Sequence, residues 1–245
     1  HAFAGWRALG EAVAIVAAVP GTELAVAAIE AGDRPAAIRA LLAAATPEQV
    51  AGLPAAARTA GLGDDDVAAY STVAQMYPDD RGAMLTPLLA FVRLDTGQAV
   101  YLPAGVPHSY IRGVGLEVMT SSDNVLRLGL TSKPVYVDRA LAALVLDKQP
   151  QVLATGIGDV IWPVAAPFVV RMLDTGSERI PTGAYRIVVL IDGSGRVESD
   201  FGEVTLRPGT AAVISADDPD TTVHADGLVA IVQSTEVGTE APREY

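Results

Sequence analysis

The hydrophobic periodicity of the chain changes near residue 86, and this change constrains the possible folds more than any other feature. Before it, apolar residues such as Trp6, Leu9, Val13 and Val16 recur at helical spacing. After it come many short β-rich runs, from PLLAFVRL to LVAIVQS, separated by glycine, proline and aspartate turns. The pattern predicts an α+β protein in which residues 1 to about 85 are helical and antiparallel sandwich or barrel modules follow.

Several helix boundaries can be predicted as well. Thr46-Pro47-Glu48-Gln49 combines an N-cap residue, a proline at the first helical position and a glutamine three residues after the cap. Gly32 and Gly61 are suited to end helices. The acidic run at 64–66 could bind a cation, but a helix start with favourable dipole contacts is the simpler interpretation. A short helical connector is expected around 136–146.

Charge and composition exclude some functions. The formal net charge is −12, so the chain would repel the phosphate backbone of a nucleic acid, and an anionic substrate would need a local basic cluster. The chain has no cysteine, which excludes disulfides and thiolate metal sites and fits a reducing compartment. No apolar run reaches the roughly 18 residues that span a bilayer. We therefore expect a soluble, cytoplasmic protein without nucleic-acid or membrane partners.

The run GQAVYLPAGVPH, residues 97–108, ends in one of only three histidines. Gly97, Pro103, Gly105 and His108 have the spacing of the second sequence motif of the cupin superfamily. In that motif a strand ends in a turn, and the histidine enters a β-barrel on the next strand. A neutral imidazole there can bind zinc, iron or manganese. A hydrogen-bonded core histidine is the alternative interpretation.

Charged residues follow His108 closely. Those within 25 positions that stand out are Glu117, Asp123, Arg127 and Lys133. Tyr110 would point to the same face as His108 if the two share a strand. Because buried charges need partners or a ligand, two interpretations are open. The charges form salt bridges between strands, or they line a polar pocket whose cations receive a phosphate or a developing oxyanion.

Residues 77–133 closely resemble type I mannose-6-phosphate isomerase. The likeness is strongest at Leu102-Pro103-Ala104-Gly105, His108-Ser109-Tyr110, Gly115-Leu116-Glu117 and Ser122-Asp123-Asn124-Val125-Leu126-Arg127. That family interconverts mannose 6-phosphate and fructose 6-phosphate with a zinc ion held in its first cupin. The resemblance therefore implies an aldose–ketose isomerase that uses zinc and binds a phosphorylated hexose.

The resemblance also implies a role for each residue of the cluster. His108 would be a zinc ligand, and Arg127 would stabilise the negative charge of an enediol-type intermediate. Further members would line the pocket (Tyr110, Glu117 and Asp123) or neutralise the phosphate (Lys133). Glu117 is in addition a candidate for the base that moves a proton between C1 and C2, on chemical grounds alone.

The resemblance implies a domain organisation too. Residues 1–85 would be a helical insertion domain, 86–135 the C-terminal strands of the catalytic cupin, and 136–245 a connector with a second, degenerate cupin. The family's other zinc ligands include a Gln-x-His pair, which the first 85 residues lack. The first cupin is therefore expected to be incomplete and to need a second copy or a complementing N-terminal segment. A non-catalytic sugar-phosphate-binding or regulatory cupin is the alternative function.

A weak internal repeat relates the two β-rich parts. Gly97 and Gly209 begin equivalent runs, and the residue eleven positions later is His108 in the first copy and Asp220 in the second. This asymmetry predicts a site in the first copy and a scaffolding or lid role for the second. His224 lies among acidic residues and is interpreted as a loop residue.

Overall fold

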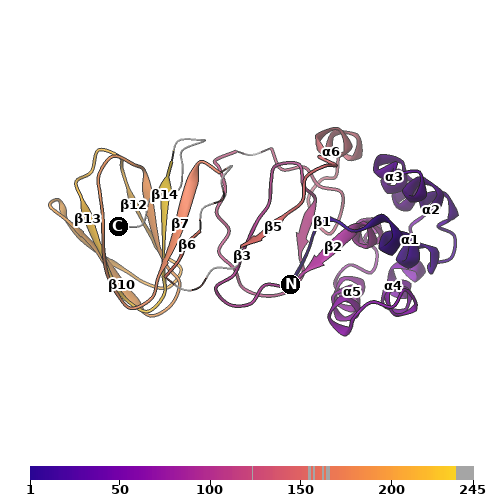
Figure 1. Ribbon diagram of the computed structural model, residues 1–245, viewed down its shortest axis with the longest axis horizontal. Helices are drawn as coiled ribbons and strands as arrows, with labels where there is room; N and C mark the ends of the chain where they lie inside the picture. Colours follow the sequence, from indigo (N-terminus) through magenta and orange to yellow (C-terminus); the bar gives the residue numbers. More distant parts are fainter. Residues whose placement is uncertain (123, 154–155, 157, 162, 164–165, 236–245) are drawn as a thin grey trace. The chain divides into compact units, whose positions relative to one another are not determined.

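The structure, a computed structural model, describes residues 1–122, 124–153, 156, 158–161, 163 and 166–235. These residues form two compact units. The first comprises residues 1–94 and 102–151, and the second comprises residues 95–101 and the described residues from 152 onward. Helices dominate the first unit and strands the second, which confirms the predicted α+β class (Figure 1). Within the described ranges, no helix is both long and apolar enough to cross a membrane.

Helices form most of the first unit. They are α1 (Leu9–Ala17), α2 (Glu23–Glu30), α3 (Arg34–Ala44), α4 (Pro47–Thr59), α5 (Asp64–Met76), the 3-10 helix η1 (Arg81–Leu88) and α6 (Val137–Ala143). Their apolar faces share one core, in which Ile15, Leu53 and Met84 are fully buried. Burying each such side chain contributes about 1.5–3 kcal/mol, so this core stabilises the helices more than their intrinsic propensity does.

The predicted helix boundaries are confirmed. Thr46 and Gln49 form a capping box at the start of α4, in which Gln49 N donates to Thr46 Oγ1 (3.3 Å) and Thr46 N donates to Gln49 Oε1 (3.0 Å). Gly32 follows α2 and Gly61 follows α4, with φ values of 75° and 79° that favour glycine. The acidic run at 64–66 forms the first turn of α5, as the helix-start interpretation requires.

The prediction that the chain is helical from its first residues is wrong. Ala2–Trp6 forms strand β1, which lies between β2 (Leu89–Val92) and β4 (His108–Tyr110) in an antiparallel three-stranded sheet. Every residue of β1 is buried, so the strand shows no alternation of apolar and polar residues. Periodicity alone cannot distinguish such a short apolar run from the start of a buried helix. The helix predicted from Trp6 therefore begins at Leu9.

The strands predicted in the middle of the chain are present only in part. The runs at 87–94, 99–103 and 108–113 contain β2, β3 (Ala99–Tyr101) and β4, and α6 occupies the predicted connector. β3 pairs with β5 (Gln151–Leu153). The runs at 116–120 and 125–130 form no strand. Neither run is hydrogen-bonded into any sheet of the described part of the chain, and a strand is not stable without such pairing.

The second unit is an antiparallel β-sandwich. Its strands are β6 (Val160–Ile161), β7 (Phe168–Leu173), β8 (Gly176–Ile180), β9 (Arg186–Leu190), β10 (Ser194–Ser199), β11 (Gly202–Leu206), β12 (Ala211–Ile214), β13 (Thr221–Asp226) and β14 (Val229–Ser234). The strand order is β11-β10-β13-β8 in one sheet and β12-β9-β14-β7-β6 in the other. Val188, Leu190, Val197 and Val223 belong to its core. This arrangement is the two-sheet form expected of a jelly roll.

A buried arginine closes one end of this sandwich. Arg186 is 0% exposed. Its guanidinium donates to the carbonyl oxygens of Pro181 (2.7 Å), Ser215 (2.7 Å) and Asp218 (3.1 Å). These carbonyls come from two separate loops, so one side chain joins the β8–β9 loop to the β12–β13 loop. The sequence pattern did not single out Arg186.

Candidate functional site

His108 lies on β4, one of the two edge strands of the three-stranded sheet, opposite Ala4 of β1. It is exposed, so the interpretation as a buried core histidine is wrong. Its Nδ1 lies 3.1 Å from the carbonyl oxygen of Val106. A carbonyl can only accept, so this contact requires the hydrogen on Nδ1 and leaves the lone pair on Nε2. An imidazole fixed in this tautomer can act as a metal ligand through Nε2.

Tyr110 and Glu117 lie beside this histidine. Tyr110 shares β4 with His108, and their ring centroids are 5.7 Å apart. The Tyr110 hydroxyl donates to Glu117 Oε1 at 2.8 Å. Burial, followed by this hydrogen bond and the negative charge of Glu117, raises the pKa of Tyr110 to about 12. The phenol therefore stays protonated at neutral pH and fixes the orientation of the carboxylate.

The two predicted cations lie further along the same segment. Arg127 is half-buried, and its Nη1 donates to the carbonyl oxygen of Val125 at 3.2 Å. Lys133 is exposed, and its backbone N donates to Thr131 Oγ1 at 3.1 Å. Among the described residues, which exclude Asp123, no ion pair joins either cation or Glu117 to another charge.

Asp123 lies outside the described residues, so its predicted place in the pocket is a proposal. The structure brings together His108, Tyr110 and Glu117. Within the described ranges, neither Arg127 nor Lys133 forms a hydrogen bond or an ion pair with any of these three residues. The catalytic and binding roles of all these residues are taken up below as proposals.

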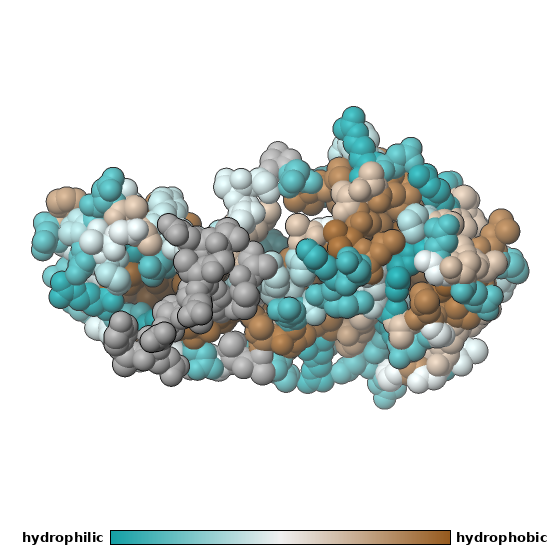
Figure 2. Space-filling model, turned by 45° about the horizontal axis from the view of Figure 1, so that its top comes forward, coloured by the Kyte–Doolittle hydropathy of each residue, from teal (hydrophilic) through white to brown (hydrophobic). Residues whose placement is uncertain are grey.

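The segment that carries these residues is poorly covered by the rest of the first unit. Its exposed apolar residues include Val114 at 104%, Met119 at 55% and Val125 at 50% of full exposure. Figure 2 shows hydrophobic surface between hydrophilic residues on the helical part of this unit. On α2, Leu24 is 82% exposed. Isolated apolar residues at a surface are normal, but a run of them within one segment is not.

A metal needs more ligands than this site provides. No group of three or more histidine, aspartate, glutamate or cysteine side chains among the described residues could hold a metal ion. Catalytic zinc usually binds three protein ligands. His108 is one suitable ligand, and the described residues do not complete a zinc site around it.

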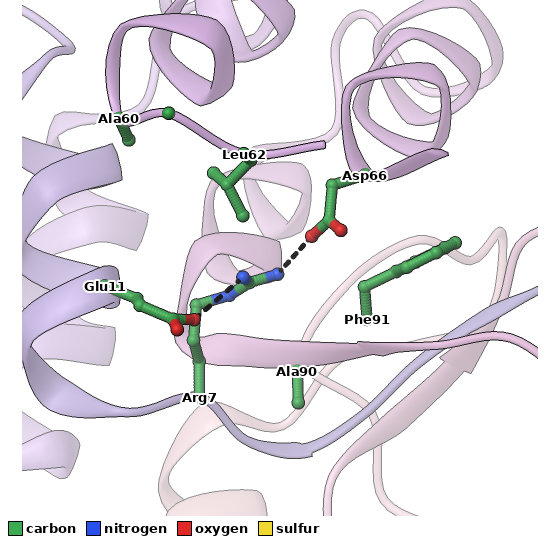
Figure 3. Close-up of a pocket in the computed structure, with 8 residues that line it drawn as sticks. Arg7, Glu11, Ala60, Leu62, Asp66, Ala90 and Phe91 are labelled. Atoms are coloured by element: carbon green, nitrogen blue, oxygen red, sulfur yellow. Dashed lines mark hydrogen bonds and ion pairs between the residues drawn. The ribbon is translucent and has the colours of Figure 1, made fainter. Parts of the chain in front are cut away.

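A cavity of about 410 Å³ lies elsewhere in the first unit (Figure 3). Arg7 lies in its wall and donates to Asp66 Oδ1 (2.9 Å), to Glu11 Oε2 (3.3 Å) and to the Leu89 carbonyl oxygen (2.9 Å). None of the predicted site residues lines this cavity. Because Arg7 is already paired with two carboxylates, it serves to join β1, α1, β2 and α5.

The second unit differs from expectation at its histidine. His224 lies on β13 and not in a loop, so that interpretation is wrong. Its Nδ1 is 2.8 Å from Ser177 Oγ on β8, and its Nε2 is 3.3 Å from Glu198 Oε2 on β10. Along β13, partly exposed residues alternate with buried ones, as in a strand with one face in the core. The acidic residues that precede this strand in the sequence are typical of a turn, which is why the sequence alone favours a loop at His224. His224 therefore belongs to a row of polar side chains across three strands.

Asp220 occupies the position that the internal repeat assigns to His108. It accepts hydrogen bonds from Thr182 N (2.9 Å) and from Arg179 Nη2 (2.8 Å). The Thr182 amide, followed by the Arg179 side chain, lowers the pKa of this carboxyl. The second copy therefore holds an arginine-bound carboxylate where the first has an exposed imidazole.

Comparison with known proteins identifies relatives. None of the known protein-family models matches the chain. Mannose-6-phosphate isomerase of Salmonella typhimurium is 31% identical over 168 residues, which are 65% of this chain and 43% of that protein. Mannose-6-phosphate isomerase 1 of Arabidopsis thaliana is 32% identical over 155 residues, 58% of this chain and 35% of that protein. The chain therefore spans less than half the length of the curated relatives that it matches.

The fold points to the same relatives. A crystal structure of a variant of phosphomannose isomerase from Salmonella typhimurium superimposes with a TM-score of 0.74 and 25% identity, covering 96% of this chain and 63% of that one. A second crystal structure of the Salmonella enzyme, bound to fructose 6-phosphate and zinc, has a TM-score of 0.70 at 24% identity. In sequence and in fold, this chain is similar to mannose-6-phosphate isomerases.

Proposed function

We propose that this chain carries part of the active site of an isomerase that interconverts mannose 6-phosphate and fructose 6-phosphate. One observation carries the proposal. Crystal structures of the Salmonella enzyme include alanine variants of a histidine, a glutamate and an arginine that follow one another at intervals of nine and ten residues. His108, Glu117 and Arg127 are separated by the same intervals.

The chemistry of the reaction matches the residues of this segment. Moving a proton between C1 and C2 needs a base, and Glu117 is a carboxylate whose orientation Tyr110 fixes through a 2.8 Å hydrogen bond. The oxygen that gains negative charge needs a cation, and Arg127 has no carboxylate partner among the described residues. Its guanidinium can stabilise the enediol-type intermediate.

The phosphate needs positive charge in a chain whose formal net charge is −12. Lys133 is one of only two lysines, and it is exposed six residues after Arg127. We assign the phosphate to Lys133, and the lining of the same pocket to Tyr110 and Asp123. A local cluster of this kind can attract an anion although the whole protein is acidic.

We include zinc in the proposal because a crystal structure of the Salmonella enzyme contains zinc together with fructose 6-phosphate. In this chain His108 would supply one ligand through Nε2. The other ligands of a three-ligand site would come from a complementing N-terminal segment or a second copy, since the described residues do not provide them. Absence of cysteine fits a reducing cytoplasm, where we place the protein.

The domain limits at residues 85 and 135 also stay proposals. We assign residues 1–85 to a helical insertion, 86–135 to the catalytic cupin and 136–245 to a connector with a degenerate cupin. The sandwich of the second unit and the arginine-bound Asp220 support a non-catalytic role for that cupin.

The test is conversion of mannose 6-phosphate by the complete enzyme, which is this chain together with the N-terminal segment or second copy that completes its zinc site, with zinc supplied and after chelation. Arg127→Ala is expected to lower turnover at least 100-fold or so while circular dichroism is unchanged, because loss of one such cation costs roughly 10²–10³ in rate. Arg58→Ala removes an exposed arginine of α4 and is the matched control, with expected turnover equal to that of the wild type.

Two results would contradict the proposal. Near-normal turnover of Arg127→Ala would refute the role of this arginine. A complete wild-type enzyme that binds fructose 6-phosphate in calorimetry but does not isomerise it with zinc present would refute the isomerase and support the non-catalytic cupin.

A further inference from the structure

Asp80 joins two parts of the first unit that lie far apart in sequence. It precedes η1, and its Oδ1 accepts a hydrogen bond from Gly82 N at 2.7 Å. Its Oδ2 accepts from Thr131 N at 3.2 Å, 51 positions further along the chain. One carboxylate therefore caps η1 and holds the segment that runs from Arg127 to Lys133.

The two backbones touch at this point. A Cβ atom built on Gly82 would come 2.3 Å from the Cα of Gly129, and a Cβ on Gly129 would come equally close to the Cα of Gly82. Only two glycines permit this approach. The next residue, Leu130, has a φ of 55°, a conformation that side chains other than glycine rarely adopt. Such strain persists only where surrounding contacts hold it.

The contacts fix the middle of the segment, whereas Arg127 at one end is half-buried and Lys133 at the other is exposed. Leu128 and Leu130 pack against the helical core. Arg127 precedes this anchored stretch and Lys133 follows it, on a segment without regular secondary structure. With no helix or strand to hold them, both cations depend on the anchor for their positions.

We propose that Asp80 is a positioning residue: by fixing the backbone at 128–131 it holds Arg127 and Lys133 where both can contact one hexose phosphate. The inference rests on the proposed function. It adds a residue that does not touch the substrate and acts through Arg127 and Lys133.

Asp80→Asn is the direct test, and Asp79→Asn is the matched control on the exposed residue next to it. The asparagine oxygen can still accept from Gly82 N, whereas its NH₂ group cannot accept from Thr131 N. Amide hydrogen exchange at Thr131 is expected to become at least about tenfold faster in Asp80→Asn alone. Turnover of mannose 6-phosphate is expected to fall roughly 10- to 100-fold, as displacement of a catalytic group by about 1 Å does.

The double variant with Arg127→Ala separates positioning from loss of stability. If Asp80 acts through Arg127 and Lys133, adding Asp80→Asn to Arg127→Ala causes a smaller further loss of turnover than Asp80→Asn causes in the wild type, because only the placement of Lys133 remains to be lost. Equal losses in both backgrounds, unchanged turnover of Asp80→Asn, or unchanged exchange at Thr131 would each overturn the inference while leaving the proposed function standing. A complete wild-type enzyme without isomerase activity would overturn both proposals, and the measurement on the wild type is sufficient to identify that case.

Discussion

Replacing Arg186 with methionine is expected to lower the free energy of unfolding of the second unit by about 3 kcal/mol. The side chain is 0% exposed and donates to the carbonyl oxygens of Pro181 and Ser215 at 2.7 Å, of Asp218 at 3.1 Å and of Ile180 at 3.4 Å. The Ser215 oxygen also accepts from Asp218 N (3.2 Å) and keeps that donor, whereas loss of the donor to the Pro181 and Asp218 oxygens costs roughly 1–3 kcal/mol each. Methionine offsets part of this loss, because it removes a buried charge whose desolvation costs several kcal/mol. The Nε of Arg186 also has no hydrogen-bond partner in the described structure, which adds to that offset.

Differential scanning calorimetry is the assay. A loss of 1 kcal/mol shifts the Tm of a domain of this size by roughly 4–8 °C, so we expect a shift of about 12–24 °C in the transition of the second unit. Arg196→Met is the control, since that arginine is 46% exposed and pairs only at the surface, where the expected loss is below about 1 kcal/mol. If Arg186→Met, like the control, lowered the free energy of unfolding by less than about 1 kcal/mol, the view that this arginine holds the two loops together would be refuted.

Further expectations concern the first unit. Glu117→Gln should lower the pKa of Tyr110 from about 12 but leave it above 10, because burial is the largest cause of the shift; absorbance titration against Tyr110→Phe measures this. The pKa of Tyr110 is higher in the folded than in the unfolded protein, so the stability that protonated Tyr110 contributes is complete below pH 10 and is lost between about pH 10 and 12. Urea unfolding of the wild type should show this loss, and unfolding of Tyr110→Phe should not. Gly129→Ala should destabilise the protein by at least about 1–3 kcal/mol, because the φ of Gly129 is 150° and a Cβ there would meet Gly82. Gly115→Ala is the control and should leave the stability unchanged, because a Cβ on Gly115 meets no atom within 4 Å. Equal stabilities of the two variants would contradict the close approach of Gly82 and Gly129.

The sequence predicts those features whose signals are local. Thr46 and Gln49 lie within one turn of each other, and their capping box follows from residue type and spacing alone. His108 and Tyr110 share a face because they share a strand, which the alternation of side chains requires. The charged residues that follow His108 are likewise identified as site candidates from the sequence, although their pattern does not predict the conformation of the segment that carries them.

Features that depend on distant partners could not be predicted. β1 is a strand because β2 and β4 lie on both sides of it, and nothing within Ala2–Trp6 indicates those neighbours. Arg186 binds carbonyls of two loops, one of them about 30 residues later, so no motif marks it. His224 resembles a loop residue until β8 and β10 are placed beside it. In each case tertiary contacts decide the structure and local preference does not.

The central position of β1 also sets an order in which the first unit can fold. Helices α1 to α5 form from contacts between residues close in sequence, which are fast to make. β1 must instead wait for β2 and β4, and the Gln149 side chain that bonds Trp6 N lies 143 positions away. Closing loops of this length carries an entropic cost before the sheet contributes any stability. The helices are therefore expected to assemble early, and the strand that bears His108 to gain its neighbour in the last, slowest step.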